Sequence, residues 1–166
     1  MLLHVRRDTV RLPDGDTATR ELIRHNGAAC VIPIDGDGNI IMVRQCRYAI
    51  GRITLEIPAG KLDGKDEDPL LCAKRELREE TGADAAEWRD LGIYYGTPAY
   101  ADERIFMYAA KELSFGSQYL DDDEFLRVER YPLEKLYEMV LRGDIEDGKT
   151  QIAVLKLAAL RQRGEF

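Results

Sequence analysis

Three glutamates near the middle of the chain have the spacing of a metal-binding site. Glu76, Glu79 and Glu80 lie in a segment of helical periodicity at residues 68–81. At about 100° per residue they fall within an arc of about 100°, beside an apolar stripe. Carboxylates gathered at a helix C-terminus repel one another and oppose the helix dipole, and a divalent cation removes both conflicts. The pattern predicts a site for Mg²⁺ or Mn²⁺, hard ions that bridge phosphate oxygens.

A glycine loop precedes this helix and is expected to complete the site. Gly60 permits a sharp backbone turn, which would let the Ala59 carbonyl face the metal. Arg75 lies one helical turn before Glu79, so its guanidinium is expected to hold and orient that carboxylate. The glutamate-rich helix end by itself is equally consistent with a solvated surface laced with salt bridges. The combination with the glycine loop favours the metal site.

The stretch 60–82 resembles the Nudix box, G-x5-E-x7-R-E-U-x-E-E-x-G-U, in which U is aliphatic. Glu67 and Arg75 match the first glutamate and the arginine of that motif. The resemblance implies metal-dependent hydrolysis of a nucleoside diphosphate joined to another moiety, with Gly60, Glu67 and Arg75 supporting the site. The groups implied to hold the ions are the carbonyl of Ala59 and the carboxylates of Glu76, Glu79 and Glu80. Glu79 is also a candidate for a direct part in catalysis.

This chain departs from the motif in two places. Six residues rather than five separate Gly60 from Glu67. Taking Asp66 as the motif acid would break the spacing to the helix, so the extra residue is placed in the loop at 61–65. Ala83 stands at the last aliphatic position, where it is small but tolerable. Neither departure removes a candidate metal ligand.

Features outside the box favour ADP-ribose as the substrate. Pro98 lies sixteen residues past Gly82, where family members that cleave ADP-ribose tend to carry a proline, and 96–103 is similar to their substrate loop. The similarity to that branch continues through residues 44–48, 55–60, 121–125 and 147–150. It implies AMP and ribose 5-phosphate as products. The alternatives are nucleotide sugars such as GDP-mannose or UDP-glucose, and a non-catalytic ADP-ribose sensor, against which the intact acids argue.

Further substrate contacts are implied by position in the similar segments. Arg47 would approach the substrate phosphates or base, since a guanidinium fork suits both, although a surface ion pair is the alternative. Glu56 and Glu21 are further candidates for polar contacts to the nucleotide.

The resemblance implies a general base from a flexible loop after the last core strands, and the acidic stretch at residues 119–124 fits that description. Aligning the chain on the pair 127–128 favours Asp122 for this role, followed by Glu124. The expected mechanism has this loop close and remove a proton from the attacking water. A charge run is also typical of a loop that is merely solvated.

Hydrophobic periodicity predicts a mixed α/β protein. Strands are expected at residues 2–5, 17–23, 28–34, 40–44, 53–57, 91–95, 104–109 and 126–131. Helices are expected at 68–81, from Pro132 to a stop at Gly143, and at 150–163. These elements interleave without regular alternation, which indicates a mixed sheet with helices on its faces. The resemblance implies a Nudix-like α/β/α sandwich.

The loop at 35–39 is expected to join strands 28–34 and 40–44 into a hairpin. Its acids match the first ligands of an EF-hand calcium loop. Ile40 and Cys46, however, stand where that loop requires glycine and a bidentate glutamate, so calcium is not expected there.

Two parts of the chain are distinguished by the pattern. Residues 1–25 are expected to form an N-terminal strand arm, with strands 2–5 and 17–23 on either side of a turn at 13–16. Residues 26–166 are expected to form the Nudix hydrolase domain. In similar enzymes such an arm is typically exchanged within a homodimer that shapes both active sites.

The composition excludes several classes of partner. With 24 Lys and Arg against 31 Asp and Glu, the net charge of −7 argues against general affinity for nucleic acid or anionic membrane. The N-terminus lacks a signal-peptide core and no apolar run reaches the roughly 18 residues of a membrane span, so a cytoplasmic location is expected. Three cysteines without metal-ligand spacing are expected to be reduced and buried, namely Cys30, Cys46 and Cys72.

Overall fold

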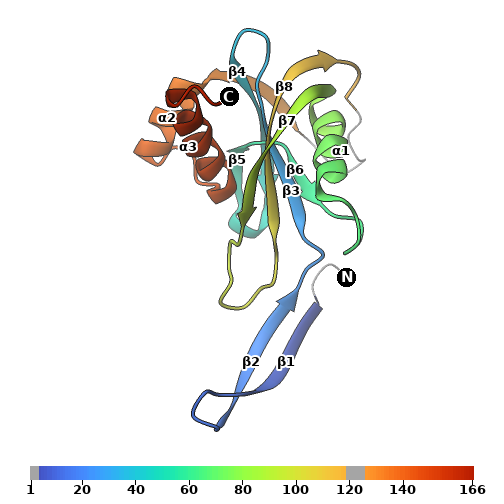
Figure 1. Ribbon diagram of the computed structural model, residues 1–166, viewed down its shortest axis with the longest axis vertical. Helices are drawn as coiled ribbons and strands as arrows, with labels where there is room; N and C mark the ends of the chain where they lie inside the picture. Colours follow the sequence, from blue (N-terminus) through green and yellow to red (C-terminus); the bar gives the residue numbers. More distant parts are fainter. Residues whose placement is uncertain (1–3, 119–125) are drawn as a thin grey trace.

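In a computed structural model, residues 4–118 and 126–166 are described (Figure 1). The strands are β1 (His4–Arg11), β2 (Thr17–Arg24), β3 (Ala28–Pro33), β4 (Asn39–Arg47), β5 (Arg52–Glu56), β6 (Ala59–Lys61), β7 (Ala83–Tyr94), β8 (Ile105–Phe115) and β9 (Arg127–Pro132). The helices are η1 (Tyr48–Ile50), α1 (Pro69–Thr81), α2 (Leu133–Arg142) and α3 (Gly148–Gln162). Within the described ranges, no helix is long and apolar enough to cross a membrane.

Two sheets form the centre of the molecule. The larger has the order β6-β3-β8-β7, in which β3 and β8 are parallel and the other pairs antiparallel. The smaller has the order β5-β4-β9 and is antiparallel. Helix α1 lies on one side of the sheets, and α2 and α3 lie on the other (Figure 1). The expected α/β/α sandwich with mixed strand directions is confirmed.

The hydrophobic core has one part on each side of the larger sheet. Ile32, Met42, Leu136 and Leu157 belong to the cluster that joins the sheets to α2 and α3. A smaller group containing Leu77 packs α1 onto the other side. These buried apolar side chains hold α1 and α3 at fixed positions relative to β3.

The hairpin expected from strands 28–34 and 40–44 is wrong in its pairing. The turn forms, with the Asp35 carboxylate accepting from the backbone N–H groups of Asp37 and Asn39 at 3.0 and 2.9 Å. After an isolated bridge between Ile34 and Ile40, however, β3 and β4 enter different sheets. Strand β8 pairs along the whole of β3 and β6 pairs with its first half, whereas β4 pairs with β5 and β9.

Capping residues determine where α1 and α3 begin. The Asp68 carboxylate accepts from the Leu70 N–H at 2.9 Å, and Gly82 ends α1 with a left-handed φ of 71°. Asp147 caps α3 in the same way, so this helix starts at Gly148, earlier than the expected 150. Pro132 lies at the N-cap of α2 rather than inside it. The expected helices are confirmed apart from these small shifts.

The cysteine expectation is wrong for one residue. All three cysteines are free; Cys30 and Cys72 are buried, whereas Cys46 is exposed. Cys46 lies near the end of β4, where the strand extends beyond the part of the sheet that other elements cover. Burial raises the pKa of the Cys30 and Cys72 thiols to about 12, so both stay protonated near neutral pH.

The arm is an antiparallel hairpin that extends away from the rest of the molecule (Figure 1). Its first strand is longer than expected and continues to Arg11. At its base, the Ile23 N–H donates to the Tyr100 carbonyl at 2.7 Å. The carboxylate of Asp102 accepts from Arg24 and from the backbone of His25, both at 2.8 Å. The β7–β8 loop therefore fixes the base of the arm.

Candidate active site

Helix α1 presents two buried carboxylates toward the loop that precedes it. Glu76 and Glu80 are 8% and 3% exposed, although both are ionisable, and Glu79 beside them is partly exposed. Buried carboxylates are costly unless they are paired or hydrogen-bonded. Their burial on one face of α1 therefore marks a built site rather than a solvated helix end.

Gly60 is needed because the Glu76 carboxylate lies directly against it. A Cβ atom at position 60 would be 2.0 Å from the carboxyl carbon of Glu76, well inside any contact distance. Gly60 is not among the glycines with positive φ and belongs to strand β6, so the expected reason, a sharp turn, is wrong. The glycine permits close approach of a side chain, not an unusual backbone conformation.

Ala59 links the loop to the second buried carboxylate. Its backbone N–H donates to Glu80 Oε2 at 3.1 Å. Strand β6, which contains Ala59 and Gly60, pairs with the fully buried strand β3. The core thus holds the loop in register with the carboxylates of α1, across 21 residues of sequence.

Arg75 binds Glu79, as its position one helical turn earlier predicts, and it also binds Glu76. Its Nη1 donates to Glu76 at 2.7 Å and to Glu79 at 3.1 Å, and its Nη2 donates to the Lys61 carbonyl at 3.1 Å. Burial opposes the charge of this guanidinium, but the Glu76 carboxylate outweighs it and raises the pKa of Arg75. Arg75 therefore orients the acids and the loop together.

Glu67 holds the loop that carries the extra residue. Its carboxylate accepts from the Asp63 N–H at 2.6 Å, and its own N–H donates to the Gly64 carbonyl at 3.3 Å. The Arg75 guanidinium lies 3.7 Å from the same carboxylate. These contacts fit the assignment of Glu67, rather than Asp66, to the motif position.

The donor set suits a hard divalent cation. The candidate ligands are the carboxylates of Glu76, Glu79 and Glu80 and the carbonyl of Ala59, the ligand types that Mg²⁺ and Mn²⁺ prefer. Over residues 4–118 and 126–166, no three His, Cys, Asp or Glu side chains are arranged closely enough to hold a metal ion. Arg75 accounts for part of this, because it binds two of the acids. The residues fit an ion in kind, and an ion would compete with Arg75 for Glu76 and Glu79.

Arg47 and Glu56, predicted separately as substrate contacts, bind each other. Arg47 Nε and Nη2 donate to the two Glu56 oxygens at 2.7 and 2.6 Å. Glu56 is 1% exposed, and Lys149 and Thr54 also donate to its carboxylate. Burial opposes ionisation, but the bond from Arg47 and the charge of Lys149 lower the pKa of Glu56 to about 2. This carboxylate is anionic and fully engaged by protein groups.

Sequence reasoning assigned no role to Lys149. This lysine is 7% exposed and binds both Glu56 and Asp147. A signal was available, because Asp147 followed three residues later by Thr150 is typical of a helix N-cap, which places Lys149 in a first helical turn. Nothing in the spacing indicated that Glu56 would lie beside it.

Two predicted contacts lie away from the glutamates of α1. Glu21 is exposed on β2 in the arm, opposite Arg7, and the arm extends away from the body (Figure 1). Pro98 is exposed in the β7–β8 loop, which contacts the base of the arm. The candidate bases Asp122 and Glu124 lie outside the described residues.

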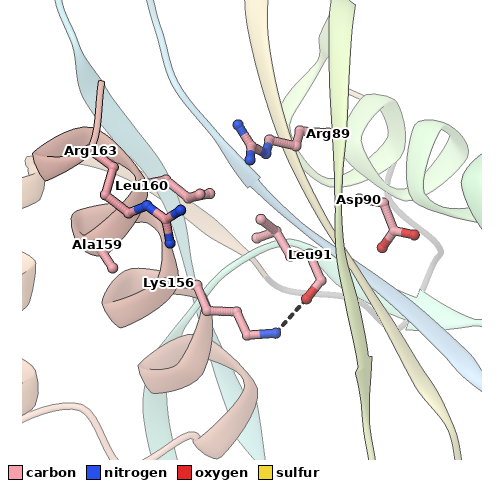
Figure 2. Close-up of a pocket in the computed structure, with 7 residues that line it drawn as sticks. All are labelled: Arg89, Asp90, Leu91, Lys156, Ala159, Leu160 and Arg163. Carbon is pink, nitrogen blue, oxygen red and sulfur yellow. Dashed lines mark hydrogen bonds between the residues drawn. The ribbon is translucent and has the colours of Figure 1, made fainter. Parts of the chain in front are cut away.

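A separate cavity of about 260 Å³ lies between β7 and α3 (Figure 2). Its basic residues already have partners: Lys156 donates to the Leu91 carbonyl, and Arg89 and Arg163 pair with Glu165. None of the residues that line it belongs to the α1 site. The cavity is therefore separate from the carboxylates of α1.

Comparisons with known proteins agree with this geometry. A family model described as the NUDIX domain matches residues 24–152. An ADP-ribose pyrophosphatase from Bacillus subtilis is 40% identical over 149 residues, covering 89% of this chain and 80% of that protein. A methanol dehydrogenase activator from Bacillus methanolicus is 42% identical over 149 residues, with coverage of 89% and 80%. A GDP-mannose pyrophosphatase from Salmonella typhimurium is 32% identical over 149 residues, covering 78% and 76%.

The fold has a counterpart among solved structures. A structure described as an ADP compounds hydrolase superposes with a TM-score of 0.84, covering 99% of this chain and 90% of that chain at 22% identity. The family match spans most of the chain, including the Gly60 loop, all of α1 and the strands that hold them. The chain therefore belongs to the NUDIX family.

Proposed function

We propose that this protein hydrolyses the diphosphate of ADP-ribose to AMP and ribose 5-phosphate in the presence of Mg²⁺, with Mn²⁺ as a second usable ion. The observation that carries the chemistry is the packing of the buried Glu76 carboxylate against Gly60. Beside it, the Glu80 carboxylate accepts from the Ala59 N–H. The 40% identity to an ADP-ribose pyrophosphatase supports the choice of substrate.

The residues that would hold the ions are the Ala59 carbonyl, Glu76, Glu79 and Glu80. A bound divalent ion would supply positive charge to the diphosphate and make a water more acidic. Arg75 holds Glu76 and Glu79 beside the loop, and bound ions would compete with it for these carboxylates. Glu67, just before α1, fixes the loop backbone by accepting from the Asp63 N–H.

Arg47 is the proposed contact to the substrate phosphates. Its Nε and Nη2 atoms bind Glu56, Nη1 takes no part in that pairing, and the side chain is 43% exposed. A guanidinium held in this way can donate to a phosphate oxygen without losing its internal partner. Glu56 then orients Arg47 instead of touching the nucleotide, while Pro98 and Glu21 remain proposed contacts from the loop and the arm.

The proposed general base is Asp122, with Glu124 as the next candidate. Gln118, just before this segment, donates its side-chain amide to the Glu80 backbone carbonyl, which supports a base from this part of the chain. We expect Asp122→Ala to lower kcat by roughly 100-fold or more, the usual contribution of a general base, with little change in Mg²⁺ or substrate affinity. Steady-state kinetics and calorimetric titration measure both quantities. Normal turnover in this variant would move the role to Glu124 or Asp123.

We propose that the arm is exchanged in a homodimer. A two-stranded hairpin is at most marginally stable by itself in water, and Val5 on this arm is 67% exposed. Tyr48 and Ile53, on η1 and β5, are also largely exposed apolar side chains. A solution mass equal to one chain in sedimentation equilibrium would contradict this proposal.

The experiment that tests the function is a substrate comparison. Initial rates with Mg²⁺ would be measured on ADP-ribose, GDP-mannose and UDP-glucose, with products separated by ion-exchange chromatography. We expect the highest kcat/KM on ADP-ribose, with AMP and ribose 5-phosphate formed in equal amounts. The 32% identity to a GDP-mannose pyrophosphatase makes GDP-mannose the relevant competitor, and a clear preference for it would overturn our choice. Binding of ADP-ribose without any product would instead indicate a sensor.

A further inference from the structure

A buried lysine joins two parts of the site that lie far apart in sequence. Lys149, in the first turn of α3, donates to Glu56 on β5, a residue 93 positions earlier, and to Asp147 Oδ1 at 3.0 Å. Burial disfavours its charge, but the two carboxylates outweigh this and raise the pKa of Lys149. A lysine so deeply buried is unusual unless its charge is paired, and here Glu56 and Asp147 pair with it.

Glu56 divides its carboxylate between two cations. Lys149 binds one oxygen from the protein interior, while Arg47 approaches both oxygens from the solvent side, with its side chain 43% exposed against 9% for Lys149. Thr54 Oγ1 donates to the same carboxylate at 2.6 Å. Lys149 offsets part of the negative charge of Glu56 from the interior. Glu56 can therefore hold Arg47 in a fixed position without cancelling the positive potential of its guanidinium.

The four charges balance, and that balance depends on Lys149. Arg47 and Lys149 face Glu56 and Asp147, and Arg47 feels the charges of Asp147 and Glu80 as well as that of Glu56. Without Lys149, two carboxylates would act on one guanidinium. The positive potential that Arg47 offers to an incoming diphosphate would fall accordingly.

The start of α3 also holds the backbone just before Ala59 and Gly60. The Asp147 carboxylate accepts from the Thr150 N–H at 2.9 Å and from its hydroxyl at 2.5 Å. The Thr150 hydroxyl oxygen in turn accepts from the Ile57 N–H at 3.0 Å, two residues before Ala59. Separate groups thus have separate effects. Thr150 fixes the position of the backbone at Ile57, and Lys149 sets the charge around Arg47.

We propose that Lys149 is a positioning residue that acts through the Arg47–Glu56 pair. By offsetting the negative charge of Glu56 and Asp147, it sets the positive potential at Arg47 and so the affinity of the site for a nucleoside diphosphate. This inference rests on the proposed function only in taking Arg47 as the phosphate contact. It assigns Lys149 no contact with the substrate. Its effect is therefore on binding of the diphosphate and not on the chemical step.

The test compares two variants that break the same ion pair with opposite changes in charge. We expect Lys149→Met to raise the dissociation constant of ADP about tenfold. KM for ADP-ribose is expected to rise by a similar factor, with kcat within about twofold. Asp147→Asn keeps an N-cap side chain and leaves the cation, so ADP is expected to bind about twofold tighter. Lys156→Met, on the same helix but bonded to the Leu91 carbonyl rather than to Glu56, is the control for losing a lysine.

Calorimetric titration with ADP decides the outcome independently of which substrate the protein cleaves. Equal weakening in Lys149→Met and Asp147→Asn would show a structural ion pair and overturn the proposal. Unchanged ADP affinity in Lys149→Met, or a loss confined to kcat, would also overturn it. If Lys149→Met does not fold, the double variant Lys149→Met/Asp147→Asn is compared with Asp147→Asn. These differ only at Lys149, and about tenfold weaker binding in the double variant is expected; equal binding overturns the proposal.

Discussion

Glu80→Gln is expected to lower kcat of ADP-ribose hydrolysis by at least about 100-fold while the protein stays folded. Glutamine retains a side-chain oxygen that can accept from the Ala59 N–H, so the link between α1 and the loop persists. What is lost is a negative charge on a group that is 3% exposed and proposed to hold Mg²⁺. Even outer partners of metal ligands cost roughly 10- to 100-fold when removed. Steady-state rates at saturating Mg²⁺ and circular dichroism measure the two effects.

The matched control is Glu87→Gln, which removes a carboxylate of the same kind from the surface. Glu87 lies on β7 and pairs with Lys111 at 3.0 Å, away from the loop at Gly60. Its loss is expected to leave kcat within about twofold, as for an exposed ion pair. Near-normal turnover in Glu80→Gln would exclude Glu80 as a metal ligand.

Gly60→Ala is expected to damage both stability and turnover. The added methyl would lie 2.0 Å from the Glu76 carboxyl carbon, so the carboxylate must leave its place and its 2.7 Å bond to Arg75. Overpacking of this kind costs about 1–3 kcal/mol, which for a domain of this size lowers the melting temperature by roughly 2–12 °C. Because the displaced group is a proposed ligand, kcat should also fall by about 100-fold or more. Thermal melting and steady-state rates check the two expectations.

Gly64→Ala offers a control in the same loop. A Cβ atom at Gly64 would meet nothing within 4 Å, and its φ is not in the left-handed region. We expect it to be neutral or slightly stabilising, since alanine restricts the unfolded chain. If Gly60→Ala kept full activity, the contact between the loop and Glu76 would not be needed for the reaction.

Local features of the sequence were sufficient to predict α1 and its acids. Helical spacing places Glu76 and Glu80 on one face, and Asp68 and Gly82 cap the two ends. The turn residues of the arm likewise predict a hairpin. Each of these depends on neighbours within a few residues, where backbone geometry alone decides which side chains lie together.

Strand partners could not be predicted in the same way. The short loop at 35–39 predicts a hairpin, but β3 already pairs with β6 and β8, so β4 joins another sheet. Which edge of a strand is free depends on segments that are distant in the chain. Local turn chemistry carries no information about that competition.

The sequence by itself determined the capped helix, the converging glutamates and the diphosphate chemistry they suit, because these follow from helical periodicity and ligand type. Only the tertiary structure decided that Gly60 makes room for Glu76 and that Lys149 lies against Glu56, 93 residues away. Both contacts arise where the core brings separate elements to within bonding distance. Their energies depend on burial, which no local pattern of residues specifies.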